Sequence, residues 1–283
     1  LPISGQASLH RIHSAKMRIT SYPEFSDQVI CRINPAFFVD LSQQSAEPVK
    51  RKIVEYEKNS ILTYTEDQIE NLIFNNPAYN DLAEKVKNFE FMFSNCSNLL
   101  NLEVAQFSTK EAISMRGMFS NLISINYLNL QNIITENVND MSYMFYNCNS
   151  LTSIEYFSNI QTKNVNNMEY MFGDCKKLNR LDLINFNTKN IENMSNMFSN
   201  CESLAILNMQ YFDTSKVTNM KNLFRNCFKL VELNIASFNT ENVKDMSNMF
   251  ENCSSLISLN INNFKTDKVT NMVNMFSNCA KLP

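Results

Sequence analysis

The stretch CKKLNRLDLINFNTKNIENMSNMFSNC, from Cys175 to Cys201, recurs along this 283-residue chain and decides its fold. Its spacing is C-x2-L-x2-L-x-L-x2-F-x-T-x2-I-x2-M-x2-M-F-x2-C. Cysteine returns every 26 residues from Cys175 to Cys279, and the Met-Phe pair of this stretch first occurs at Met92 and Phe93. A fixed period between about 20 and 50 residues is the sequence signature of a solenoid or repeat array. The repeat therefore predicts a stack of similar coils.

The periodicity changes inside each copy of the repeat. Leu181 and Leu183 alternate with polar residues, which is the pattern of a short strand. Ile191, Met194 and Met197 are three residues apart, which favours one face of a short helix. We therefore expect an α/β fold in which each 26-residue coil is a strand, a loop and a short helix, with its apolar residues pointing inward. Because one coil buries too little apolar surface to offset the entropy of ordering its backbone, neighbouring coils must stack.

The repeat begins only at about residue 89. Residues 1–64 contain short alternating segments and a helix pattern that starts with Pro, which together predict a small α/β N-terminal module. A capping-box pattern at Thr65–Gln68 predicts a further helix. We therefore place the solenoid at 65–283, with a helical N-terminal cap at about 65–88 and repeats at about 89–283.

Two polar positions keep the same residue type in successive copies. Threonine lies at the entry to the predicted helical half, where its hydroxyl can satisfy an unpaired backbone N–H. The residue before the repeated cysteine is usually Asn, as at Asn200, and Asn tolerates the left-handed backbone found at helix ends. Because an active site is built from different residues that converge, we interpret both repeated positions as structural. The threonine ladder comprises Thr109, Thr135, Thr162, Thr188, Thr214, Thr240 and Thr266.

Six cysteines occupy one repeat position and are expected to form a second ladder. Coils about 5 Å apart would bring neighbouring thiols within disulfide range, so distance alone leaves bridges open. Parallel stacked side chains seldom reach the dihedral angle of a disulfide, and Leu122 fills the same position without sulfur. We therefore favour buried free thiols, and neither the cysteine spacing nor a nearby His indicates a metal site. The predicted ladder comprises Cys148, Cys175, Cys201, Cys227, Cys253 and Cys279.

One copy departs from the period, because Cys148 and Cys175 are 27 residues apart. The extra residue falls near Phe157–Ile160, after the predicted strand. We expect it to bulge a loop outward and to leave the core intact.

The outward positions of the predicted strands form a polar, mildly acidic face. One row of this face is mostly Asn or acidic, whereas the other row differs in chemistry from coil to coil. The alternatives are an ordinary solvated sheet and a surface for a protein partner, and the varied row supports the second. The candidate binding face comprises Asn101, Glu103, Tyr127, Asn129, Glu155, Arg180, Asp182, Ile206, Asn208, Glu232, Asn234, Ser258 and Asn260.

The repeat unit resembles the BspA-like leucine-rich repeat family, also called DUF285 surface-protein repeats. The copies that fit best are FDTSKVTNM at Phe212–Met220 and MFENCSSL at Met249–Leu256. The resemblance covers about 89–283 and implies a leucine-rich-repeat-like solenoid. It also implies a cell-surface or adhesive role, and it transfers no catalytic residue.

Composition excludes several classes of function. The net charge of −3 argues against a nucleic-acid partner, which selects a basic face, and no apolar run approaches the ~18 residues of a transmembrane segment. His10 and His13 have no accompanying Cys or Asp cluster, so a solvated arm is favoured over a metal or catalytic site. No nucleophile–base pair or phosphate loop indicates an enzyme in residues 1–64, and we predict no cofactor.

The sequence therefore predicts a non-enzymatic protein-binding protein at the cell surface or secreted. The alternative is a structural or scaffold subunit of a large intracellular or organellar assembly, which free thiols in every coil and the absence of a disulfide framework would favour. Pro283 follows Cys279 by four residues without a polar cap. We therefore expect either further repeats or a partner that makes an end-on contact with the C-terminal coil.

Overall fold

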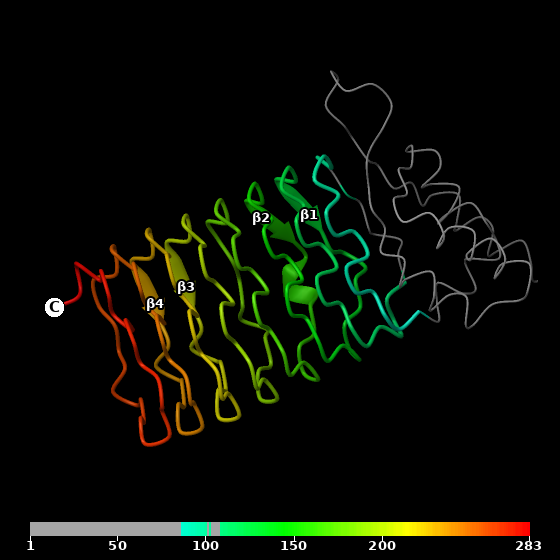
Figure 1. The fold of residues 1–283 in the computed structure, drawn as a ribbon. Helices are drawn as coiled ribbons and strands as arrows, with labels where there is room; N and C mark the ends of the chain where they lie inside the picture. Colours follow the sequence, from blue (N-terminus) through cyan, green and yellow to red (C-terminus); the bar gives the residue numbers. More distant parts are fainter. Residues whose placement is uncertain (1–85, 101, 103–107) are drawn as a thin grey trace, which may run out of the picture.

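The computed structural model describes residues 86–283 except 101 and 103–107, and in this range the chain is a solenoid. Successive coils lie side by side along the stack up to the C-terminus (Figure 1). Parallel backbone bridges join neighbouring coils at equivalent positions, from Asn88 with Ser114 to Asp245 with Asn271. The stack of coils predicted from the 26-residue repeat is therefore confirmed.

Short parallel strands occupy the predicted strand position in several coils. β1 (Tyr127–Asn129) pairs with β2 (Ser153–Glu155), and β3 (Ile206–Asn208) pairs with β4 (Glu232–Asn234). In both pairs the central apolar residue of one strand lies opposite that of the other and packs in or against the core. Because alternate side chains of a strand point to opposite faces, the flanking residues point outward.

The coil with the extra residue contains a short 3-10 helix, η1 (Phe157–Asn159), after Tyr156 in the left-handed region at φ 55°. Phe157 and Ile160 remain buried, so the predicted bulge with an intact core is confirmed. The strand expected at Leu181–Leu183 in the next coil is not formed, and β2 and β3 belong to separate sheets.

The prediction of a short helix in each coil is wrong. In the quoted copy, residues 195–200 form consecutive turns. The amides of Met197, Ser199 and Cys201 donate to carbonyls three residues back, at 3.3, 3.1 and 3.1 Å. The amides of the alternate residues donate across to the next coil, as Asn196 does to Lys221 at 2.8 Å. An α-helix would keep all these donors within one coil, so sharing every second amide with the neighbour excludes it.

This alternation of hydrogen bonds requires a left-handed residue at two positions per coil. In the quoted copy these are Asn196 at φ 59° and Asn200 at φ 61°. Left-handed backbone costs most L-residues about 1–2 kcal/mol, and Asn is among the residues that adopt it most readily. The left-handed conformation predicted for the residue before the cysteine is therefore confirmed, whereas the second left-handed position was not predicted.

The core is a set of stacked apolar ladders that run the length of the solenoid. The largest members are phenylalanines, whose rings lie nearly parallel; Phe198 and Phe224, for example, have centroids 5.8 Å apart at an interplanar angle of 3°. Methionine, leucine and cysteine ladders flank them and are almost completely buried. The phenylalanine ladder comprises Phe93, Phe119, Phe145, Phe172, Phe198, Phe224, Phe250 and Phe276.

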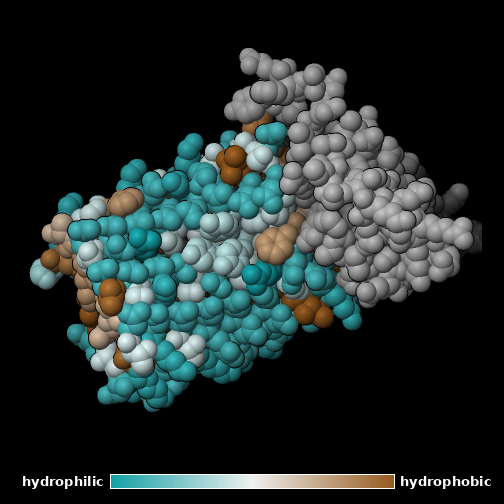
Figure 2. All heavy atoms as spheres, viewed as in Figure 1, coloured by the Kyte–Doolittle hydropathy of each residue, from teal (hydrophilic) through white to brown (hydrophobic). Residues whose placement is uncertain are grey.

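The two ends of the described region differ. The predicted module at 1–64 lies outside the described residues, and of the predicted helical cap only 86–88 are described, which are not helical. Val86 and Phe89 are buried and join the core. At the C-terminal end hydrophobic atoms gather on the surface, while the visible side of the coils is mostly hydrophilic (Figure 2). The exposed apolar residues there are Ile257, Met272, Val273 and Phe276.

Candidate functional site

Where strands pair, the residues of the predicted face line up from one coil to the next. Tyr127 lies opposite Ser153, and Ile206 lies opposite Glu232, so the varied row runs from coil to coil as expected. Asn101 and Glu103 lie outside the described residues. Tyr127 and Asn129 are half-buried, whereas the rest of the described face is exposed. The exposed members are Glu155, Arg180, Asp182, Ile206, Asn208, Glu232, Asn234, Ser258 and Asn260.

The row of this face that is mostly Asn or acidic has a structural function that the sequence did not reveal. The side-chain oxygen of Asn208 accepts the backbone N–H of Gln210 at 3.1 Å, two residues further on. Such a contact fixes the turn that follows the strand. The same contact is made by Asn129, Asp182, Asn234 and Asn260. These side chains are therefore partly committed to the fold, and the varied row is the part of the face left for recognition.

Each interior threonine joins its coil to the next. The hydroxyl of Thr214 accepts the backbone N–H of Asn239 at 2.7 Å and donates to the carbonyl of the same residue at 2.8 Å. The expectation that the hydroxyl satisfies a backbone N–H is correct, but that N–H belongs to the following coil and not to a helix. Thr266 in the last coil is exposed. The threonine ladder is thus a structural bridge between coils.

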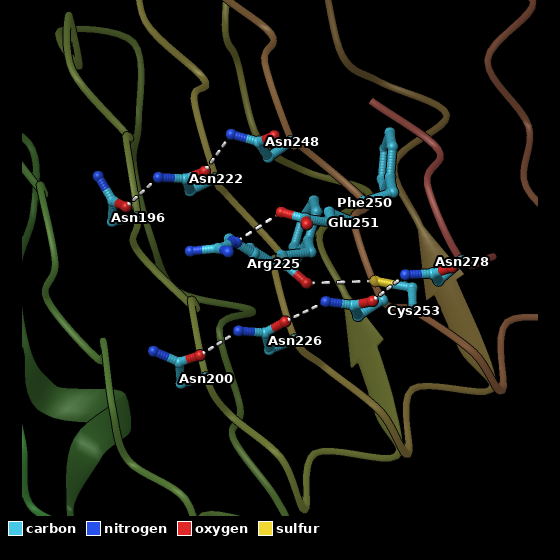
Figure 3. A network of polar contacts seen from close by, with 12 residues as sticks. Asn196, Asn200, Asn222, Arg225, Asn226, Asn248, Phe250, Glu251, Cys253 and Asn278 are labelled. Atoms are coloured by element: carbon cyan, nitrogen blue, oxygen red, sulfur yellow. Dashed lines mark hydrogen bonds and ion pairs between the residues drawn. The ribbon is translucent and has the colours of Figure 1, made fainter. Parts of the chain in front are cut away.

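Two ladders of side-chain amides run along the turns (Figure 3). In one, Nδ2 of Asn222 donates to Oδ1 of Asn196 at 2.7 Å. In the other, Nδ2 of Asn226 donates to Oδ1 of Asn200 at 2.6 Å. Both ladders join residues with left-handed backbone. These amides are occupied by their neighbours, which agrees with the structural interpretation.

The cysteine ladder is buried and hydrogen-bonded. The thiol of Cys227 donates to the carbonyl of Phe198 in the preceding coil, at 3.2 Å. Burial raises the pKa of Cys148 and Cys227 to about 12. All six predicted ladder cysteines are free, and all but the half-buried Cys279 are buried, which confirms the prediction for them. Cys96 is disulfide-bonded, so the expectation of a free thiol in every coil is wrong.

A strip of aromatic side chains lies on the turn segments of the N-terminal coils. The rings of Tyr143 and Tyr170 stack with centroids 5.0 Å apart, and Tyr146 meets both edge-on at 5.6 and 5.4 Å. The guanidinium carbon of Arg116 lies 5.2 Å from the centre of the Tyr143 ring and 5.9 Å from that of Phe91. All five side chains are half-buried. We call Phe91, Arg116, Tyr143, Tyr146 and Tyr170 the aromatic strip.

Two glycines make room for this strip. A Cβ added to Gly117 would lie 2.3 Å from the Phe91 ring, and one added to Gly173 would lie 2.6 Å from the Tyr170 ring. The chain has only three glycines, and two of them stand directly against an aromatic ring of the strip. The rings therefore lie close against the backbone, which holds them in place.

Sequence reasoning missed the aromatic strip, although a signal was present. The first left-handed position is Asn in the later coils, as at Asn196 and Asn222, but Phe91, Tyr143 or Tyr170 in the earlier ones. Because the later coils fold with Asn at this position, the aromatic residues of neighbouring earlier coils are not required by the fold and indicate a distinct surface.

The part of the chain that the structure describes contains no group of three His, Cys, Asp or Glu side chains arranged to hold a metal ion. Within the same residues, no helix has the length and apolar character of a membrane span. His10 and His13 lie outside the described range. The described features that remain as candidate sites are the varied row of the strand face and the aromatic strip.

Similar coils occur in solved bacterial proteins. A leucine-rich repeat protein from Eubacterium ventriosum is 18% identical with a TM-score of 0.37, covering 55% of this chain and 44% of that one. A T. pallidum leucine-rich repeat protein is 21% identical with a TM-score of 0.30, covering 56% and 72%. A leucine-rich cell surface protein from Faecalibacterium prausnitzii is 15% identical with a TM-score of 0.28, covering 69% and 67%. The chain spans less than half the length of the first.

The family assignment comes from the sequence. No curated protein matches the chain. The family described as "Mycoplasma protein of unknown function, DUF285" matches residues 49–132, 66–180, 124–208 and 205–283. These ranges together cover 49–283, well over half of the chain, and confirm the resemblance drawn from the repeat. The chain therefore belongs to the DUF285 repeat family.

Proposed function

We propose that this chain is a non-enzymatic protein-binding repeat protein, at the cell surface or secreted, that recognises its partner through the strand face. The observation that carries the proposal is that, within each coil, one set of side chains joins neighbouring coils and another set remains available for a partner. Threonine, asparagine and cysteine side chains are occupied in joining one coil to the next. The varied row of the strand face is exposed except at the half-buried Tyr127, and it changes in chemistry from coil to coil.

The varied row supports recognition of an extended protein surface. In the described coils it presents an aromatic, a cationic, an aliphatic and an acidic side chain: Tyr127, Arg180, Ile206 and Glu232. Ile206 is 58% exposed, and such an apolar side chain on a rigid strand is well placed to be covered by a partner. Stacked repeats generally use such extended surfaces for binding.

A structural subunit of an intracellular assembly is the alternative. It is supported by the six free thiols, because reducing compartments keep cysteines unpaired. The resemblance of the repeat to BspA-like surface-protein repeats favours the cell surface or secretion instead. We therefore give the surface or secreted role precedence.

Labelling of intact source cells with a membrane-impermeant amine reagent tests the location. We expect this protein in the labelled fraction before lysis. Labelling only after lysis would favour the intracellular assembly. A known cytoplasmic protein of the same cells serves as the control for leakage.

Binding to purified matrix proteins such as collagen, fibronectin and laminin tests the strand face. We expect at least one to bind the immobilised chain and to bind a variant with Arg180→Ser, Ile206→Ser and Glu232→Ser at least about tenfold more weakly. Serine stands at the same position in other coils, at Ser153 and Ser258, so the variant keeps the fold. Equal binding by the variant would exclude the strand face as the site.

A further inference from the structure

We propose that the aromatic strip is a second binding surface, which takes up arginine or lysine side chains from a basic segment of a protein partner. The strip lies on the turn segments, whereas the proposed binding face lies on the strands, so this inference does not depend on the strand face. It rests on three features of the described residues: an internal cation already held by the rings, carboxylates beside the outer rings, and rings fixed in place.

Arg116 shows what the rings bind. Its guanidinium lies within 6 Å of the ring centres of both Phe91 and Tyr143. A cation over an aromatic face is attracted by the negative potential of the ring, and the attraction grows as water is excluded. The half-buried rings of the strip provide such a partly dry environment. The strip therefore already recognises a guanidinium within its own chain.

The other end of the strip has the same kind of rings and negative charge beside them. The carboxylate of Glu169 interacts electrostatically with Tyr143 and Tyr170, and that of Asp174 interacts with Tyr146 and Tyr170. Burial and these carboxylates raise the pKa of all three tyrosines, so the hydroxyls stay neutral and the carboxylates provide the charge. Tyrosine faces with two carboxylates around Tyr170 are complementary to a cation.

Two arginines of the described coils near this end are already engaged. Arg116 lies over its two rings. Arg225, whose charge reaches Tyr170, pairs with Glu251 at 2.6 Å, as Figure 3 shows. Asp174 accepts hydrogen bonds from neutral groups, the amide of Asn200 at 2.8 Å and the hydroxyl of Tyr146. A basic side chain from a partner would therefore supply the positive charge that Glu169 and Asp174 lack among the described residues.

Charge complementarity favours a basic protein segment over other ligands of aromatic surfaces. A proline-rich peptide or a neutral saccharide would gain from contact with the rings but would leave Glu169 and Asp174 without a cation. Arginine gains from both, because its planar guanidinium stacks on aromatic faces and also pairs with carboxylates. An extended basic segment along the strip would meet Tyr143 and Tyr170 in turn, since they belong to successive coils.

The test uses a fluorescent nona-arginine peptide and the full chain, with binding followed by fluorescence anisotropy at about 0.15 M salt. The decisive variant carries Tyr143→Asn, Tyr146→Ser and Tyr170→Asn. These are the residues of a later coil at the same positions, Asn196 and Ser199, so the variant follows the repeat and keeps every charge. We expect it to bind nona-arginine at least about tenfold more weakly, since the three rings on which the peptide's guanidinium groups would stack are lost.

Two further variants test whether the peptide binds the strip or is only attracted by the net negative charge of the protein. Glu169→Gln with Asp174→Asn is expected to weaken binding about as much as the ring variant, and Asn already fills the position of Asp174 in other coils. Tyr211→Ser removes an exposed tyrosine outside the strip and should leave binding unchanged; Ser237 fills that position in the next coil. Circular dichroism verifies that each variant is folded.

Undiminished binding of nona-arginine by the ring variant would overturn the proposal, because binding would then follow net charge alone. Binding of a polyproline peptide or a cello-oligosaccharide by the native chain, with no binding of nona-arginine, would overturn it in favour of a neutral ligand. Failure of the strand-face variant to lose its partner concerns the proposed function alone and leaves this test unaffected.

Discussion

The side-chain amide of Asn226 donates to Oδ1 of Asn200 at 2.6 Å, one coil away, and both residues have φ 61°. Two requirements meet at this position. The backbone must be left-handed so that alternate amides can reach the next coil, and the polar side chain must find a partner on a half-buried surface. Asparagine meets both, because its short amide is donor and acceptor and it tolerates left-handed backbone.

Replacing Asn226 separates these requirements. Asn226→Gly keeps the left-handed backbone and loses the amide bonds to Asn200 and Asn252, so we expect a loss of about 1–2 kcal/mol in unfolding free energy. Asn226→Ala loses the same bonds and adds the strain of a left-handed Cβ, so it should cost about 1–2 kcal/mol more. Thermal unfolding followed by circular dichroism gives the order, and an alanine variant as stable as the glycine variant would contradict it.

Removing the hydroxyl of Thr214 should break the bridge between two coils. Thr214→Val keeps the shape of the side chain but leaves the N–H and C=O of Asn239 without their partner, at a cost of about 2–4 kcal/mol. Thr266→Val is the matched control, because its side chain is exposed in the last coil and it should cost less than about 0.5 kcal/mol. Urea unfolding curves of the two variants test the difference. Equal losses would show that the bridge between coils is not the cause.

The repeat was predictable because its information is local and repeated. The period of the cysteines established the stack, and the alternation at positions such as Leu207 gave the strands. The turns at 195–200 were mistaken for a helix because both structures place apolar residues three apart. What distinguishes them is the hydrogen bonding of alternate amides to the next coil, a contact between residues about 25 positions apart that no local pattern contains.

The candidate sites were less predictable for the same reason. The varied row followed from strand alternation, but the commitment of Asn208 to its own turn became visible only from the bond to Gln210. The aromatic strip depends on which rings lean across neighbouring coils. Gly117 shows this, since its meaning comes from the Phe91 ring that covers it and not from its own place in the sequence.

The buried thiols predict that the solenoid loses stability in mildly alkaline solution. In the folded chain the pKa of Cys227 is raised from 9.0 to about 12, because burial disfavours the thiolate. Between these values the unfolded chain releases a proton that the folded chain retains, so unfolding becomes easier as pH rises. Each such thiol contributes up to about 1.4 kcal/mol per pH unit. We expect the Tm to be steady from pH 7 to 8 and to fall steeply from pH 9 to 10.

A single substitution checks that the thiols are the cause. Cys227→Ala lowers the Tm at pH 7, because it removes buried sulfur and the bond to Phe198, but it should also reduce the fall in Tm between pH 9 and 10. Lys221→Ala, an exposed change in the same coil, should leave the slope unchanged. An unaltered slope in the cysteine variant would assign the alkaline loss to other groups.

The packing of Phe91 on Gly117 predicts an energetic coupling that a double-mutant cycle can measure. Gly117→Asn introduces the residue that later coils carry at this position, as at Asn196, and Asn tolerates the backbone at φ 57°. Its Cβ would nevertheless lie 2.3 Å from the Phe91 ring, so we expect a loss of about 1–3 kcal/mol in unfolding free energy as the ring is displaced.

In the background of Phe91→Asn the same change should cost little, because the ring is gone and two asparagines in successive coils can form an amide bond like the one that joins Asn196 to Asn222. The difference between the two costs is the coupling energy, and we expect at least about 1 kcal/mol. Urea unfolding of the four proteins provides it. A coupling near zero would mean that Gly117 is required for its backbone alone and that the position of the Phe91 ring does not depend on it.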